Sequence, residues 1–144
     1  MREKIMAAYD GSEVSKKAIQ EALSREASSE NTEVHIVSVV NGSGPYTNAV
    51  IAEDFNHEIL KDVEEDLNKI KRDFHPVHTP IITEVLIEPS ESNAGRRLCE
   101  YADKHDIDLV IVGNRGLGKV KNFLLGSVSK DVVQNTKCPV LVMK

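Results

Sequence analysis

Short apolar runs rich in valine and isoleucine recur along the chain and predict five β-strands, at residues 4–9, 33–40, 81–87, 109–112 and 140–143. Between these runs the apolar residues return every three or four positions, which is typical of amphipathic helices with one buried stripe each. The four stripes comprise Val14, Ala18, Ile19, Ala22 and Leu23; Phe55, Ile59, Val63, Leu67, Ile70 and Phe74; Ala94, Leu98 and Ala102; and Val128, Val132 and Val133.

The alternation of strands and helices predicts an α/β fold with a parallel sheet that carries helices on both faces. Each strand–helix–strand connection is expected to be a right-handed crossover. The continuous apolar strands agree, because a strand buried on both faces loses the alternation of polar and apolar residues. No linker interrupts the 144 residues, so a single domain spanning residues 1–144 is expected.

Composition narrows the classes of partner. The chain has 18 Lys and Arg residues against 23 Asp and Glu, a formal charge of −5 and 4% aromatic residues, which disfavours a nucleic-acid binder. No apolar run is long enough for a secretory signal or a membrane span, so a cytoplasmic protein without membrane contact is expected. Cys99 and Cys138 lack Cys-x-x-Cys spacing and fit two reduced, buried thiols.

Glycines and basic residues gather directly after the fourth predicted strand. Four of the eight glycines are Gly113, Gly116, Gly118 and Gly126. Residues 109–130 include no Asp or Glu, whereas Arg115, Lys119, Lys121 and Lys130 are basic. Ligands of open α/β sheets bind beyond the carboxyl ends of strands, and glycine lets backbone N–H groups approach an anion. The pattern indicates a phosphate site that includes the amino-terminus of the fourth helix; the alternative is a surface loop with incidental lysines.

Two familiar phosphate loops fit this segment poorly. The Walker A pattern needs a Ser or Thr hydroxyl for Mg²⁺ where this chain has Val120. The dinucleotide fingerprint needs a third glycine where this chain has Lys121. Neither a P-loop nor a dinucleotide-binding fingerprint is therefore expected.

The spacing that does match is Gly113, two residues, Gly116, nine residues, then Gly126 and Ser127. Here the sequence resembles the universal stress protein family, and within it the ATP-binding subgroup. The resemblance spans the whole chain through the segments 9–12 (YDGS), 108–113 (DLVIVG), 126–129 (GSVS) and 138–142 (CPVLV). It implies a five-stranded parallel sheet of order 3-2-1-4-5, with a Rossmann-like or adenine nucleotide alpha hydrolase-like fold.

The resemblance also implies a nucleotide site, carried over position by position. Asp10 would meet the adenine or ribose side, and Val39 would offer backbone groups to the adenine. Gly113, Arg115 and Gly116 would line the ribose and first phosphates, and Gly126, Ser127, Val128 and Ser129 would bind phosphate oxygens. Ala8 and Val112, near the ends of the first and fourth strands, complete the predicted nucleotide-binding set.

Several of these residues have simpler readings. Asp10 could cap a turn with Ser12, and Ser127 and Ser129 could serve only as helix N-caps. Val39 is compatible with the core whether or not a ligand binds.

A binding protein is the first hypothesis for function: a ligand-responsive homodimer in stress response or signalling that binds ATP, ADP or AMP, with slow hydrolysis at most. No catalytic residue and no protein-only metal site are predicted, although Asp10 could help to hold Mg²⁺ brought by the nucleotide. Two alternatives stay open: a slow ATP-hydrolysing enzyme, and a phosphoacceptor signalling domain of flavodoxin-like fold in which Asp10 and Glu88 supply the acidic site.

The last predicted strand, with Val140, Leu141, Val142 and Met143, presents an apolar edge that invites pairing with another chain. The family resemblance points to a two-fold dimer through this strand. A protein partner that the sequence does not identify is compatible with this picture.

Overall fold

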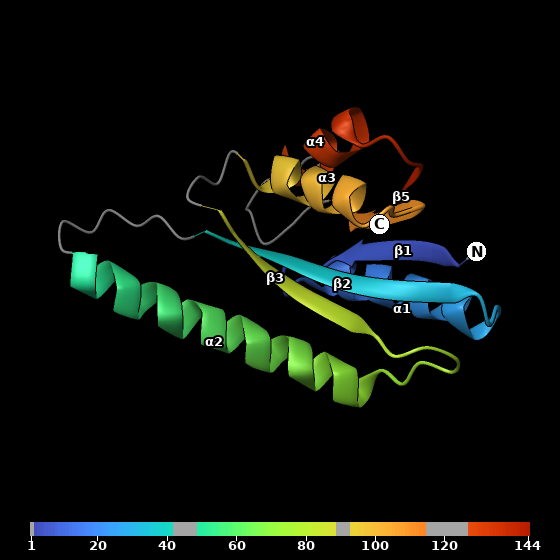
Figure 1. Ribbon diagram of the computed structural model, residues 1–144, viewed down its shortest axis with the longest axis horizontal. Coiled ribbons are helices and arrows are strands. Elements are labelled where there is room, and N and C mark those ends of the chain that lie inside the picture. The colour runs from blue at the N-terminus through green and yellow to red at the C-terminus, as the bar shows by residue number, and fades with distance from the viewer. Residues whose placement is uncertain (1, 42–48, 89–92, 115–126) are drawn as a thin grey trace.

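Five parallel strands form a single sheet at the centre of the computed structural model, which describes residues 2–41, 49–88, 93–114 and 127–144. The strands are β1 (Glu3–Ala8), β2 (Thr32–Asn41), β3 (Ile82–Glu88), β4 (Leu109–Gly113) and β5 (Val140–Met143). Their order is β3-β2-β1-β4-β5, and every neighbouring pair is parallel (Figure 1). The predicted fold class and strand order are confirmed.

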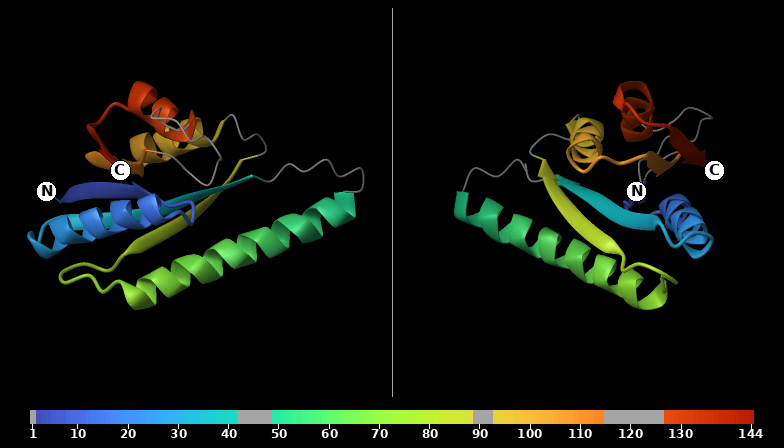
Figure 2. Two further views of the ribbon diagram at one scale, coloured as in Figure 1. Left: turned by 180° about the vertical axis from the view of Figure 1, so that it is seen from behind. Right: turned by 45° about the vertical axis from the view of Figure 1, so that its right-hand side comes forward.

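Four helices cover the two faces of this sheet: α1 (Glu13–Ala27), α2 (Ala49–Asp73), α3 (Ala94–Lys104) and α4 (Ser127–Asn135). The helices α1 and α2 pack on one face, and α3 and α4 pack on the other (Figure 2). Among the described residues, no helix combines the length and the apolar character that crossing a membrane requires.

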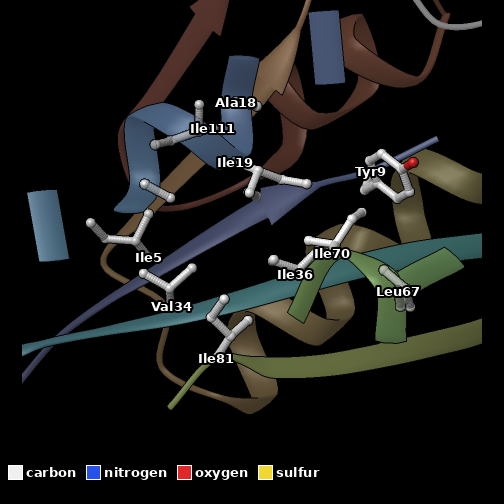
Figure 3. Close-up of a cluster of buried hydrophobic side chains, with 12 residues drawn as sticks. Ile5, Tyr9, Ala18, Ile19, Val34, Ile36, Leu67, Ile70, Ile81 and Ile111 are labelled. Atoms are coloured by element: carbon white, nitrogen blue, oxygen red, sulfur yellow. The ribbon is translucent and has the colours of Figure 1, made fainter. Parts of the chain in front are cut away.

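The cluster between the sheet and helices α1 and α2 forms one half of the core (Figure 3). Ile5, Ile36 and Ile111 contribute from β1, β2 and β4 and are fully buried. Ile19 of α1 and Ile70 of α2 pack against them. Side chains alternate across a strand, so the neighbouring positions point to the opposite face and build the second cluster with α3 and α4.

Two predicted stripe positions differ from the structure. Val133 is 41% exposed, whereas its neighbour Val132 is fully buried. One residue turns a helix by about 100°, which carries Val133 of this short helix past the edge of the buried stripe that contains Val132. Phe74 lies one residue beyond the end of α2, although it still packs against the first cluster.

A chain of polar side chains joins the second cluster near the beginning of β2. His35 is buried, and its two ring nitrogens lie 2.7 Å from Glu33 Oε1 and 2.8 Å from the hydroxyl of Tyr101 on α3. Burial, followed by the charges of Glu84 and Glu33, raises the pKa of Tyr101 to about 12, so its phenol stays protonated at neutral pH. The ring of His105 stacks on Tyr101 at 4.0 Å between centroids. This chain fixes the carboxyl-terminal end of α3 to β2.

A buried carboxylate holds the segment between α2 and β3. Glu26, near the end of α1, has 0% exposed surface and accepts backbone N–H bonds from Val77, His78 and Thr79 at 2.8, 2.5 and 2.7 Å. Burial alone would raise the pKa of Glu26, but these three N–H groups outweigh burial and bring the pKa below its usual range. The side chain of Glu26 is therefore ionised in the folded protein and holds the backbone of residues 77–79 in place.

Replacement of Glu26 should destabilise the fold in a pH-dependent way. We expect Glu26→Gln to lower the free energy of unfolding at pH 7 by roughly 1.5–3 kcal/mol, because an amide NH₂ group would face backbone donors. The pKa of Glu26 is lowered on folding, so its stabilisation is present above the ordinary value of 4.5 and is lost as the pH falls through the folded-state pKa. Urea unfolding from pH 7 down to pH 3 measures this effect.

The exposed Glu30 near the same helix end offers a matched control, and Glu30→Gln should leave stability within about 0.5 kcal/mol of the wild type. Equal stability of Glu26→Gln and wild type at pH 7 would contradict the claim that the ionised side chain of Glu26 stabilises the fold.

Candidate functional site

The ends of β1 and β4 lie side by side at the carboxyl edge of the sheet. The register pairs Ala7 of β1 with Ile111 of β4, two residues before Gly113 ends β4. The chain leaves β1 toward α1 on one face and approaches α4 on the other face after β4. This is the topological switch point of the sheet, where ligands of open α/β folds bind.

The connection from β1 to α1 is a hydrogen-bonded turn. The carboxylate Oδ1 of Asp10 accepts bonds from the backbone N–H of Ser12 at 2.9 Å and from its hydroxyl at 2.5 Å. Gly11 has φ 87°, a left-handed conformation that favours glycine. Ser12 is the N-cap of α1 and accepts from the N–H of Ser15 at 3.2 Å. The turn role considered for Asp10 is thus present, and it places this exposed carboxylate at the carboxyl edge.

Tyr9, which the sequence pattern assigned only to a strand, anchors the start of this turn. Its N–H donates to Val37 O at 2.9 Å, and its carbonyl accepts from the hydroxyl of Ser38 at 2.8 Å. Its phenol donates to Asp66 of α2 at 2.7 Å. Burial and then the bond to Asp66 raise the pKa of Tyr9 well above its usual value. No signal in the sequence could have paired Tyr9 with one particular acid of α2.

On the other side of the switch point, the first turn of α4 is tied to the end of β4. The buried Ser129 donates its hydroxyl to the carbonyl of Gly113 at 2.5 Å. Ser129 therefore uses its side chain to place α4 and not as an N-cap, and Ser127 is the first residue of the helix. The N–H groups of a helix's first turn have no partner within the helix, so this turn can donate to an anion.

Asn114, which sequence reasoning also missed, continues the same connection. Its N–H donates to Met143 O of β5 at 2.8 Å, which joins the ends of β4 and β5. Arg115, Gly116 and Gly126 lie outside the described residues, as do Lys119 and Lys121.

Apolar residues of the predicted set share one side of the sheet. Val112 is 2% exposed and belongs to the second core cluster, and Ala8, Val39 and Val128 are partly buried against that cluster. The structure thus brings these four residues to the face covered by α3 and α4. The core role considered for Val39 is present in the structure.

The first turn of α4 carries no acidic residue, and Lys130 next to it is exposed. The partial positive charge at a helix amino-terminus therefore faces no carboxylate of the same turn. Within residues 2–41, 49–88, 93–114 and 127–144, His, Cys, Asp and Glu form no group of three or more that could hold a metal ion. The described part of the site has the chemistry to hold an anion.

Comparison with known proteins identifies the family. A family model described as the universal stress protein family matches residues 1–144. Universal stress protein MJ0531 of Methanocaldococcus jannaschii is 34% identical over 144 residues, a match covering 98% of this chain and 81% of that protein. The chain belongs to the universal stress protein family.

Solved structures agree on the fold. UspA from Lactobacillus plantarum superposes with a TM-score of 0.85 at 20% identity, covering 100% of this chain and 99% of the other. A universal stress protein in complex with cAMP superposes with a TM-score of 0.66 at 26% identity, and the match covers 98% of this chain and 95% of the other. The universal stress protein from Archaeoglobus fulgidus in complex with dAMP superposes with a TM-score of 0.63 at 19% identity, and the match covers 100% of this chain and 98% of the other.

Proposed function

We propose that this chain binds an adenine nucleotide at the switch point between β1 and β4. The observation that carries the proposal is the bond from Ser129 to Gly113, which holds the amino-terminus of α4 beside the carboxyl end of β4. Family members in complex with cAMP and dAMP support an adenine nucleotide as the ligand. Within the family we assign the chain to the ATP-binding subgroup, on the glycine spacing of its sequence.

Each part of the nucleotide has a proposed partner. The phosphates meet the first turn of α4, where Ser127, Val128 and Ser129 offer N–H groups and Ser127 adds an exposed hydroxyl. Gly113 and the edge position of Asp10 serve the ribose, and backbone groups at Val39 serve the adenine. Arg115, Gly116 and Gly126 complete the phosphate loop in this proposal.

We infer binding as the main activity, with slow hydrolysis at most. In the described part of the site the groups offered to phosphates are backbone N–H groups and hydroxyls, which bind and orient but do not take protons at neutral pH. Mg²⁺, where it takes part, comes with the nucleotide and lies near Asp10.

We also propose a cytoplasmic location. Cys99 and Cys138 are free thiols, which supports it. Cys99 is buried, as expected, whereas Cys138 is only partly buried.

We further propose that two copies pair through β5. Leu141 and Met143 pack against the first core cluster and Val140 and Val142 against the second, yet all four stay half-buried. In the described part of the chain, β5 pairs with β4 on one side only. A second copy would cover the remaining surface of β5. Because Asn114, next to the proposed nucleotide site, bonds to Met143 of β5, nucleotide binding would then affect the dimer interface.

Thermal melting tests nucleotide binding. We expect ATP, ADP or AMP at about 100 times its Kd to raise the Tm by ~5–10 °C, because a ligand of the folded state stabilises it by mass action. Ser127→Ala should weaken binding by about 10- to 150-fold, the effect of losing one hydrogen bond to a charged oxygen. Calorimetric titration measures the affinity.

The exposed Ser24 on α1 gives the matched control, and Ser24→Ala should bind as the wild type does. An unchanged Tm of the wild type with every adenine nucleotide at millimolar concentration would rule out the proposed function. An assay for phosphate release under the same conditions decides between binding and slow hydrolysis.

Sedimentation equilibrium tests the dimer. At micromolar concentration the wild type should sediment at twice the 15.9 kDa of one chain. A charge at the half-buried edge, as in Val142→Lys, should shift the protein toward monomer, since a lysine on an edge strand opposes pairing. A monomeric wild type at this concentration would contradict the dimer.

A further inference from the structure

Helices α3 and α4 cross with almost no space between them at Gly95. Gly95 is buried in the first turn of α3. A Cβ atom at this position would lie 2.6 Å from Cβ of Asp131, 3.1 Å from the carbonyl oxygen of Val128 and 3.3 Å from Oδ2 of Asp131. All three atoms belong to α4, so the contact sets how closely the two helices approach.

The shortest of these contacts cannot be relieved by a side-chain rotation. Cβ of Asp131 is bonded directly to the backbone of α4, and non-bonded carbon atoms pack at about 3.5–4.0 Å. Even the single methyl group of alanine at position 95 would therefore force the backbones of α3 and α4 apart.

The part of α4 that Gly95 contacts is the part that carries the proposed phosphate site. The carbonyl of Val128 lies in the same turn as Ser129, whose hydroxyl bonds to Gly113 at 2.5 Å. The first turn of α4 is thus placed from two directions, by β4 through Ser129 and by α3 through Gly95. A shift of α4 away from α3 would strain the bond to Gly113 and turn the free N–H groups.

We propose that Gly95 is a positioning residue of the nucleotide site: its missing side chain lets α4 lie where its first turn meets the phosphates. The inference rests on the proposed function, and it concerns the phosphates alone. The three atoms that fix the spacing at Gly95 all belong to α4 and none to β1 or the turn at Asp10, so we expect the larger effect on phosphate binding and a much smaller one on nucleoside binding.

Affinities for AMP and adenosine, measured by calorimetry, test the proposal. Gly95→Ala should weaken AMP binding at least 10-fold and change adenosine binding less than 2-fold. Asp131→Gly removes the Cβ that blocks the methyl group, so the double variant Gly95→Ala/Asp131→Gly should regain AMP affinity to within 3-fold of Asp131→Gly alone. The matched control Gly95→Ala/Asp131→Ala keeps that Cβ and should stay weak.

Each outcome decides a separate point. Undiminished AMP binding by Gly95→Ala, or an equal loss for AMP and adenosine, overturns the positioning role. If Gly95→Ala does not fold, the double variant Gly95→Ala/Asp131→Gly, which lacks the blocking Cβ, replaces it: an AMP affinity within 3-fold of Asp131→Gly alone supports the proposal, and an AMP affinity that stays at least 10-fold weaker overturns it.

A wild type that binds no adenine nucleotide overturns the proposed function. The packing claim, that Gly95 sets the position of α4 against α3, is then tested on the ligand-free protein. Backbone amide resonances of residues 127–131 that move in Gly95→Ala and return in Gly95→Ala/Asp131→Gly support the packing claim, and unmoved resonances overturn it.

Discussion

Strand β1 lies at the centre of the sheet with neighbours on both edges and helices on both faces, and the rest of the structure follows from its burial. Ile5, Met6 and Ala7 have no exposed surface. Alternate side chains must therefore be covered from opposite sides, which requires two helical layers and two hydrophobic clusters. The helix after β1, α1, covers one face of the sheet, and the helix after β4, α4, covers the other. The carboxyl ends of β1 and β4 therefore lie between the two helical layers, where open α/β sheets bind ligands.

Helix α3 links this edge to the opposite end of the sheet. Its carboxyl-terminal part is fixed to β2 through the chain from Tyr101 to His35 and Glu33. Its amino-terminal part sets the position of α4 through Gly95. The buried polar chain and the glycine contact thus both involve α3, and in our proposal they help to place the first turn of α4 relative to Gly113. On the other face, Glu26 fixes the segment that leads into β3.

Much of the fold could be predicted because strands and helices leave local patterns. The apolar runs gave every strand to within a residue or so at each end, and the order 3-2-1-4-5 came from the family resemblance. Val133 was assigned wrongly because spacing alone cannot tell which of two adjacent valines faces α3. Asp10 and Gly113 could be placed at one edge because they follow predicted strands, and Ser127 to Ser129 were added by the family resemblance and by the predicted start of the fourth helix. The bonds of Ser129 to Gly113 and of Tyr9 to Asp66, and the contact of Gly95 with Asp131, join residues far apart in sequence, and no local pattern marks such pairs.

We propose that the first turn of α4, held by the bond between Ser129 and Gly113, is the phosphate-binding element of this family member. The most direct test is a titration of the ¹⁵N-labelled wild-type chain with AMP and, separately, with adenosine, followed through backbone amide resonances. We expect the amides of Ser127, Val128 and Ser129 to shift strongly with AMP and little with adenosine, because their N–H groups meet the phosphate. Amide shifts that are equal for both ligands, or that leave these three residues unmoved while AMP binds, would contradict this proposal.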